Sequence, residues 1–345
     1  MADLWFRWRQ FIIAIVGAGV VMALALLLAG LVGGITAETQ NTLGGVGADT
    51  WILTTQSGGR VGQGLLPDAY VPVIARTPGV TRAGPIVLLF GTNLEAGAKT
   101  ISINVMGAVP GGLGSPTAAT VTTGRPVTGP GQLVADSASG LTVGSQVRVG
   151  SLGFRVVGLV SGRTLLAGEP MVYMTLSDAQ VVGLAGHPFA SAVAVTGTPA
   201  RVPAGLQALS TATIEQNTVS GLSGAVSSIN NTKILMYLVA AIIIAALMYV
   251  SALQRVRDFA VLKALGSSTG ALFGSLALQA VIVSLLAAIF ASVVCNFMGG
   301  IFKQQVAIPT DAFYTLPIVA IVVGIISSLV ALRQVTGADP AAAFG

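Results

Sequence analysis

The residue types that could carry out catalysis are few in this chain, and they do not form an active-site pattern. Residues 266–270, Gly-Ser-Ser-Thr-Gly, fit the G-x-S-x-G pattern of a hydrolase nucleophile elbow. That elbow needs a preceding strand and a histidine base. Here a charged helix is expected before it, and the single histidine, His187, lies far away in the chain. We therefore interpret residues 266–270 as a turn with a helix cap, and His187 as an ordinary loop residue.

The sequence indicates neither a metal site nor a nucleotide site. No cluster of His, Cys, Asp and Glu has metal-ligand spacing, and no G-x-x-x-x-G-K-[ST] loop is present to cradle a phosphate. Folding could still bring together carboxylates that stand apart in the sequence. We therefore expect no cofactor and no catalysis in this chain itself. The isolated carboxylates are Asp136, Glu169, Asp178 and Glu215.

The composition is that of an integral membrane protein. Of the 345 residues, 53% are hydrophobic and only 8% are charged, whereas soluble domains carry about 25% charged residues. The net charge of +5 does not indicate nucleic-acid binding, because basic residues flank apolar segments on one predicted side, the pattern of the positive-inside rule. These basic residues are Arg7, Arg9, Arg255, Arg257, Lys263 and Arg333.

Four apolar segments are long enough to cross a bilayer, which takes about 20 residues. A cleaved signal peptide is the alternative for the first segment, but its apolar core would be only about 7–15 residues long. We therefore predict four membrane helices per chain, with both termini in the cytoplasm. The only cysteine, Cys295, lies within the third segment, so an intrachain disulfide is excluded. The segments are residues 11–35, 234–253, 271–298 and 312–332.

The chain divides into four parts by composition. Residues 1–36 form an anchor and the first span, and residues 232–345 carry the other three spans and a cytoplasmic tail. Residues 37–203 are rich in Gly, Pro, Ser, Thr and Val, which predicts an external α+β domain. Residues 204–231 have apolar side chains at roughly helical spacing and predict a helical stalk. In the domain we expect helices at 67–76 and 176–184 and strands at 50–55, 86–90, 100–106, 132–135, 146–149, 154–160, 171–174 and 192–196.

A short charged segment, residues 254–266, joins the second span to the third. Its three basic residues place it in the cytoplasm. The sequence from 257 to 268, Arg-Asp-Phe-Ala-Val-Leu-Lys-Ala-Leu-Gly-Ser-Ser, resembles the R-x-x-E-[FI]-A-x-L-[RK]-A-[LI]-G-A motif of FtsX/MacB-like ABC-transporter permeases. The tail, with Arg333 and Asp339-Pro340-Ala341, and the domain segment 134–160 also resemble this family. Asp258 stands where the family usually has glutamate, and no ATPase domain is fused to either end, as in a separate MacB- or DevC-like subunit.

The resemblance implies a homodimeric permease in the bacterial cytoplasmic membrane. A separate ABC-type ATPase, which binds ATP and Mg, would dock on the cytoplasmic helix and move the external domain, with export of a hydrophobic or amphiphilic substrate. The alternative is a regulator that transmits motion to an external enzyme or sensor without transport. An external adaptor or lipoprotein and membrane lipid are further expected partners. The expected ATPase-coupling residues are Arg257, Asp258, Phe259, Leu262, Lys263 and Gly266.

Overall fold

The computed structural model describes residues 8–166, 168–254, 261, 268–298 and 312–336. The chain forms two compact units, a helical unit that contains the first 33 residues and most residues from 225 onward, and an α/β unit of residues 34–224. Each unit is described by itself. The six expected ATPase-coupling residues lie outside the described residues, so their role stays a prediction.

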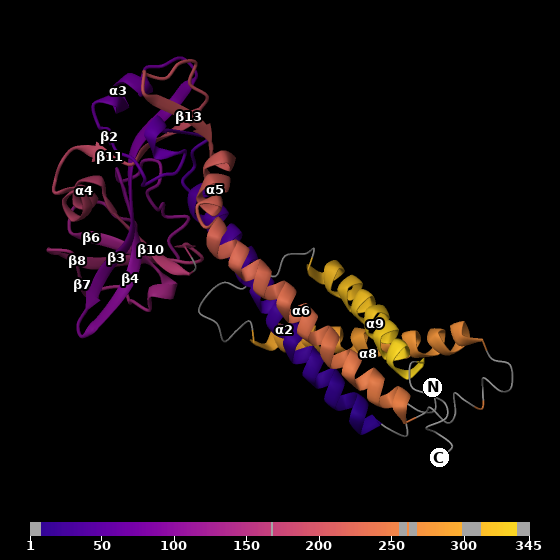
Figure 1. The fold of residues 1–345 in the computed structure, drawn as a ribbon. Helices are drawn as coiled ribbons and strands as arrows, with labels where there is room; N and C mark the ends of the chain where they lie inside the picture. Colours follow the sequence, from indigo (N-terminus) through magenta and orange to yellow (C-terminus); the bar gives the residue numbers. More distant parts are fainter. Residues whose placement is uncertain (1–7, 167, 255–260, 262–267, 299–311, 337–345) are drawn as a thin grey trace. The chain divides into compact units, whose positions relative to one another are not determined.

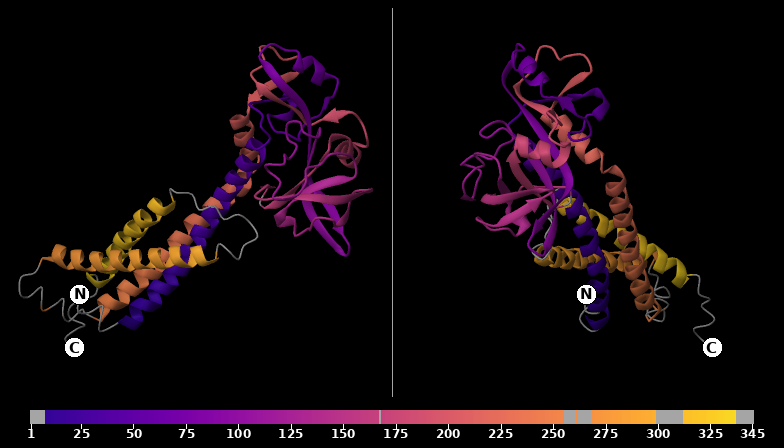
Figure 2. Two further views of the ribbon diagram at one scale, coloured as in Figure 1. Left: turned by 180° about the vertical axis from the view of Figure 1, so that it is seen from behind. Right: turned by 90° about the vertical axis from the view of Figure 1, so that its left-hand side faces the viewer.

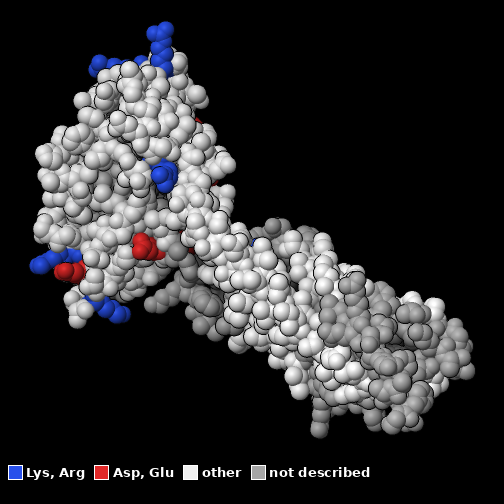
Figure 3. All heavy atoms as spheres, viewed as in Figure 1, with Lys and Arg blue, Asp and Glu red and all other residues white. Residues whose placement is uncertain are grey.

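The helical unit is built from long apolar helices (Figures 1 and 2). By length and composition, the described helices contain three membrane-span candidates, residues 11–44, 223–253 and 274–297. The described apolar part of a further helix is shorter, residues 317–326, so the count of four spans also stays a prediction. The face of this unit seen in Figure 3 is almost free of charged side chains where it is described. The helices are α2 Trp8–Thr39, α6 Ser223–Leu253, α8 Thr269–Met298 and α9 Ala312–Thr336.

Small residues let these helices approach closely. A side-chain carbon at Gly19 of α2 would lie 2.6 Å from Phe290 of α8, and one at Gly324 of α9 would lie 2.9 Å from the backbone of Val281 in α8. Membrane helices gain stability from such close van der Waals packing, because lipid removes most of the hydrophobic drive for association. The packed core combines apolar residues of all four helices, for example Met22.

The α/β unit is organised around one eleven-stranded sheet. Its strands run in the order β13-β1-β12-β3-β4-β10-β6-β8-β5, with β7 paired to β3 and β8, and β9 paired to β10; β2 and β11 form a separate two-stranded ribbon. The strands are β1 Thr50–Thr54, β2 Leu66–Pro67, β3 Val80–Ala96, β4 Lys99–Ala108, β5 Thr123–Gly124, β6 Gln132–Asp136, β7 Gln146–Val149, β8 Leu152–Val160, β9 Thr164–Leu165, β10 Glu169–Thr175, β11 Phe189–Ala190, β12 Ala192–Gly197 and β13 Leu206–Ser210.

Alternating side chains place a core on each face of the sheet, as expected for strands whose residues point to opposite faces. In β1, Trp51 and Leu53 belong to the core that also takes in Leu43, whereas Ile52 belongs to a second core beside helix α3 (Tyr70–Ala75). A third core lies beside helix α4 (Leu176–Leu184) and contains Val172 of β10. The segment that follows α2 packs on the first face, because its Leu43 belongs to the core there.

The expected strands are present, and so is the helix expected at 176–184. The helix expected at 67–76 is shorter, because Pro67 lies in β2, and the short strands β5, β9 and β11 are additional. The largest difference comes after residue 204. The helix expected from there begins only with α5 (Thr211–Ser220), because residues 206–210 form β13, the antiparallel neighbour of β1. Leu206 and Leu209 have helical spacing, but the free edge of β1 offers backbone hydrogen bonds to an extended segment. Pairing across the sheet therefore outweighs the local helical pattern.

Candidate functional site

The last residues of α2 belong to the α/β unit and lead into its core. After Thr39 the chain continues as a π-helical turn, η1 (Gln40–Gly44), in which Thr42 and Leu43 are buried. Leu43 is 0% exposed and belongs to the core of Trp51. The Thr42 hydroxyl donates a 2.7 Å hydrogen bond to the Thr164 carbonyl in β9. A local π turn of this kind is often found at functional positions.

A buried carboxylate adds a second connection at the same place. Glu38, on the last turn of α2, is fully buried, and its Oε2 accepts a 3.0 Å hydrogen bond from the backbone N–H of Gly168. Gly168 lies in the turn that joins β9 to β10. The β9–β10 hairpin is therefore held to α2 through Glu38 and to η1 through Thr42.

The segment that returns toward α6 is anchored in the same core. Ile214 of α5 is fully buried beside Leu43. Trp51 donates from Nε1 to the Thr211 hydroxyl at 3.1 Å, and that hydroxyl donates to the Ala48 carbonyl at 2.5 Å. Both segments that lead to the membrane helices thus end in one packed region, which we call the junction: residues 38–44 and 211–220 with β9 and the turn after it.

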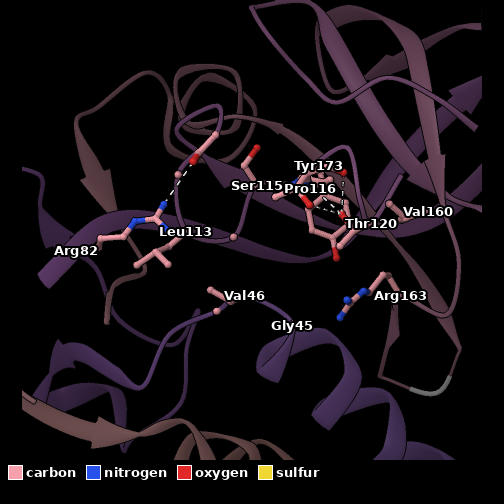
Figure 4. Close-up of a pocket in the computed structure, with 15 residues that line it drawn as sticks. Gly45, Val46, Arg82, Leu113, Ser115, Pro116, Thr120, Val160, Arg163 and Tyr173 are labelled. Carbon is pink, nitrogen blue, oxygen red and sulfur yellow. Dashed lines mark hydrogen bonds between the residues drawn. The ribbon is translucent and has the colours of Figure 1, made fainter. Parts of the chain in front are cut away.

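A pocket of about 250 Å³ lies beside the junction (Figure 4). Figure 4 shows Arg163 and Tyr173 reaching into it near one end, with Arg82 at the other end and Val46 along one side. Three of its lining residues are glycines of one loop, Gly111, Gly112 and Gly114. The lining residues are Gly45, Val46, Gly47, Arg82, Gly111, Gly112, Leu113, Gly114, Ser115, Pro116, Thr117, Thr120, Val160, Arg163 and Tyr173.

Sheet register explains why the charged groups meet here. Strands β6 and β8 are parallel, with Asp136 opposite Val160. The segments that follow the two strands therefore begin side by side, at the carboxyl ends of the strands. Asp136 accepts hydrogen bonds from the backbone N–H groups of Ala138 at 2.8 Å and Arg163 at 2.7 Å. Burial raises the pKa of the Asp136 carboxyl, while these backbone bonds and the Arg163 charge act to lower it. Asp136 thereby fixes the backbone that carries Arg163.

Tyr173 and Gly45 complete the surroundings of the Arg163 side chain. Tyr173 projects from β10 onto the core face, and burial raises the pKa of its phenol, so it is a neutral donor at physiological pH. The Arg163 guanidinium lies directly against Gly45, where an added side-chain carbon would collide with it. Gly45 has an ordinary φ of −70°, so close approach, and not backbone conformation, requires the glycine there.

The structure gives the isolated carboxylates separate structural partners. Glu169 accepts from the Ser102 hydroxyl at 2.8 Å, and Asp178 accepts from the backbone N–H of Gly131 at 3.0 Å. His187 is exposed and makes an edge contact with Phe189, as expected for a loop residue. Within the described part of the chain, no group of three or more His, Cys, Asp or Glu could hold a metal ion.

The four helices and the large insert between the first two define the class of protein. A family model described as "FtsX-like permease C-terminal" matches residues 233–340. The chain is also similar over its whole length to curated ABC transporter permeases. It belongs to the FtsX-like ABC transporter permeases, and it is therefore a membrane protein whose family works with an ATPase partner.

Two relatives and one solved structure illustrate the similarity. The chain is 34% identical over 346 residues to the uncharacterized ABC transporter permease Rv0072 of Mycobacterium tuberculosis, covering 100% of this chain and 98% of the relative. It is 35% identical over 347 residues to the uncharacterized permease Mb2592 of Mycobacterium bovis, with the same coverage. The crystal structure of the periplasmic region of MacB from Actinobacillus actinomycetemcomitans matches 52% of this chain and 96% of that one, at 16% identity and a TM-score of 0.36.

Proposed function

We propose that this chain is a permease subunit that couples ATP hydrolysis by a separate ATPase to movement of an external α/β domain, and that this movement exports a hydrophobic or amphiphilic substrate. One observation carries the proposal: the chain passes from α2 into the domain core through helix and π turn, with Leu43 fully buried. A displacement of α2 along its axis would act directly on the core, because no slack segment lies between Thr39 and Leu43.

The proposal includes four spans, cytoplasmic termini and a homodimer. The ATPase would dock on residues 254–266, with Phe259 as the apolar anchor and Arg257, Asp258 and Lys263 setting orientation and encounter rate. Buried aromatic anchors often dominate interfaces, which is why we single out Phe259. A non-transporting regulator would use the same mechanics, so the alternative differs only in what the external domain acts on.

An insertion at the domain entrance tests the coupling. Four residues, Gly-Ser-Gly-Ser, inserted between Thr39 and Gln40 should leave ATPase binding intact but abolish ATP-driven transport, because flexible Gly/Ser segments transmit no force. The matched control is the same insertion after Gly97, which is exposed in the turn between β3 and β4. The assay is ATP-dependent export of a fluorescent amphiphile in proteoliposomes that contain the permease and its ATPase.

The outcomes separate the alternatives. Normal export by the Thr39 insertion variant, with the domain folded, would contradict mechanical coupling. If the native complex hydrolyses ATP and moves the domain but exports no amphiphile, the regulator alternative replaces the exporter. Loss of ATPase binding in the Thr39 variant would contradict the placement of the docking site on residues 254–266.

A further inference from the structure

We propose that the pocket beside the junction is an anion-binding site that takes a phosphate group, with Arg163 and Tyr173 as its ligands. The proposal concerns ligand binding by the α/β unit itself and holds whether the protein transports or regulates. Phosphate chemistry has two sources, a lipid headgroup and free inorganic phosphate, and the test below distinguishes them.

The pocket offers donors without matching acceptors. Within the described part of the chain, the Arg163 guanidinium and the Tyr173 hydroxyl have no hydrogen-bond partner, although both reach into the cavity (Figure 4). No carboxylate is among the lining residues. A guanidinium has five donors and no acceptor, and a neutral phenol can add one more. A ligand that supplies hydrogen-bond acceptors would satisfy these donors. An anion is such a ligand.

The neighbouring charges leave the site positive. Asp136 offsets part of the Arg163 charge, but both of its oxygens already accept backbone N–H groups and it does not line the pocket. Arg82 adds a second cation at the far end of the pocket, where it donates to the Gly111 carbonyl at 3.4 Å. Two guanidinium groups therefore line the pocket, and no carboxylate does. A fixed guanidinium fork matches the oxygens of a phosphate in geometry as well as in charge.

The size of the pocket selects a headgroup. Pockets for drug-sized ligands measure about 300–1,000 Å³, and this one is about 250 Å³. It can hold a phosphate with a few more atoms. An adjacent open hollow shares Arg163 and Gly45 with it, so the guanidinium can be reached from solvent. The remaining residues of that hollow are Gln40, Asn41, Ser161 and Gly162.

The test uses isothermal titration calorimetry on the full chain in a nonionic detergent. The probes are inorganic phosphate and soluble dihexanoyl phosphatidic acid, with zwitterionic dihexanoyl phosphatidylcholine as the comparison lipid. Arg163→Gln should weaken binding of the anionic probe by about tenfold or more, as expected for the loss of a charge-assisted hydrogen bond. Tyr173→Phe, which keeps the ring, should weaken it by about threefold to tenfold.

Two further variants complete the design. Gly45→Ala keeps the guanidinium but places a carbon against it and against the Asn41 carbonyl, so it should displace both groups and also weaken binding. Arg155→Gln is the matched control, because it makes the same charge change at an exposed position on β8 outside the pocket. Arg155 lies between Gln132 and Gln146 of the neighbouring strands. This variant should bind the anionic probe as the native chain does.

Each outcome decides the proposal. Binding of phosphatidic acid alone identifies a lipid headgroup, and equal binding of inorganic phosphate identifies the free anion; both support the site. No measurable binding of either anionic probe would overturn it. Equal losses in Arg155→Gln and Arg163→Gln would also overturn it, because binding would then follow total charge. If Arg163→Gln fails to fold, unchanged binding by folded Tyr173→Phe rejects the assignment.

Discussion

Substitution of Leu43 by alanine probes the attachment of α2 to the domain core. Leu43 is 0% exposed, and its neighbours in the core include Trp51 and Ile214 from two other elements. Leucine-to-alanine changes at buried sites cost about 2.7–5 kcal/mol, with the larger losses where the cavity cannot collapse. The segment just before this position is held in place by the Thr42 hydrogen bond and by the hydrogen bond to Glu38. We therefore expect a loss of about 3 kcal/mol or more in the free energy of unfolding of the domain.

The assay is denaturant unfolding of the full chain in nonionic detergent, followed by tryptophan fluorescence. Trp51 is fully buried and reports on the domain, while the other two tryptophans, Trp5 and Trp8, lie at the N-terminus. Leu65→Ala is the matched control, because Leu65 belongs to the same domain and is 45% exposed; it should change stability by less than about 0.5 kcal/mol. A loss for Leu43→Ala no greater than that of the control would refute the anchoring of α2 in the core.

Three further predictions follow from the sequence and the packing. In a cysteine-free background, a cysteine at Ser137 should react with a membrane-impermeant reagent from outside, and one at Ser268 only after permeabilisation; external labelling at Ser268 would contradict the topology. Phe259→Ala should leave the permease folded and dimeric but weaken ATPase binding by about 2 kcal/mol or more, measured by co-purification, and retained binding would contradict the docking role. Gly324→Val should lower stability in detergent by about 1–3 kcal/mol through a clash with Val281, and an unchanged thermal transition would argue against close packing of α8 and α9.

Local patterns in the sequence were sufficient for most elements of the fold. The short β-like stretch at residues 50–55 and the apolar run after Ser268 predict β1 and α8 within a few residues, because each pattern reflects a buried strand or a buried span. The segment 206–210 was assigned to a helix because its leucines fit both periods. Its strand pairing depends on β1, about 155 residues earlier in the chain, and a single-sequence pattern does not contain that information.

The site could not be predicted because its contacts are made across the sheet. Arg163 and Tyr173 meet Gly45 only through the register of β6, β8 and β10, and Glu38 reaches Gly168 across 130 residues. The sequence did identify Asp136 as an isolated carboxylate, but its backbone partners at Ala138 and Arg163 appear only in the folded chain.

The most direct test of the proposed coupling is a distance measurement in the complex with the ATPase. Spin labels would be placed at Ser137 in the domain and at Ser275 on α8, both exposed, and double electron–electron resonance would be recorded with ADP and with a non-hydrolysable ATP analogue. Dilution with unlabelled permease isolates distances within one chain. If the domain moves with the nucleotide state, the distance distribution shifts between the two nucleotides, and the insertion after Thr39 removes the shift. Identical distributions in a complex that hydrolyses ATP at its normal rate would contradict the proposed coupling.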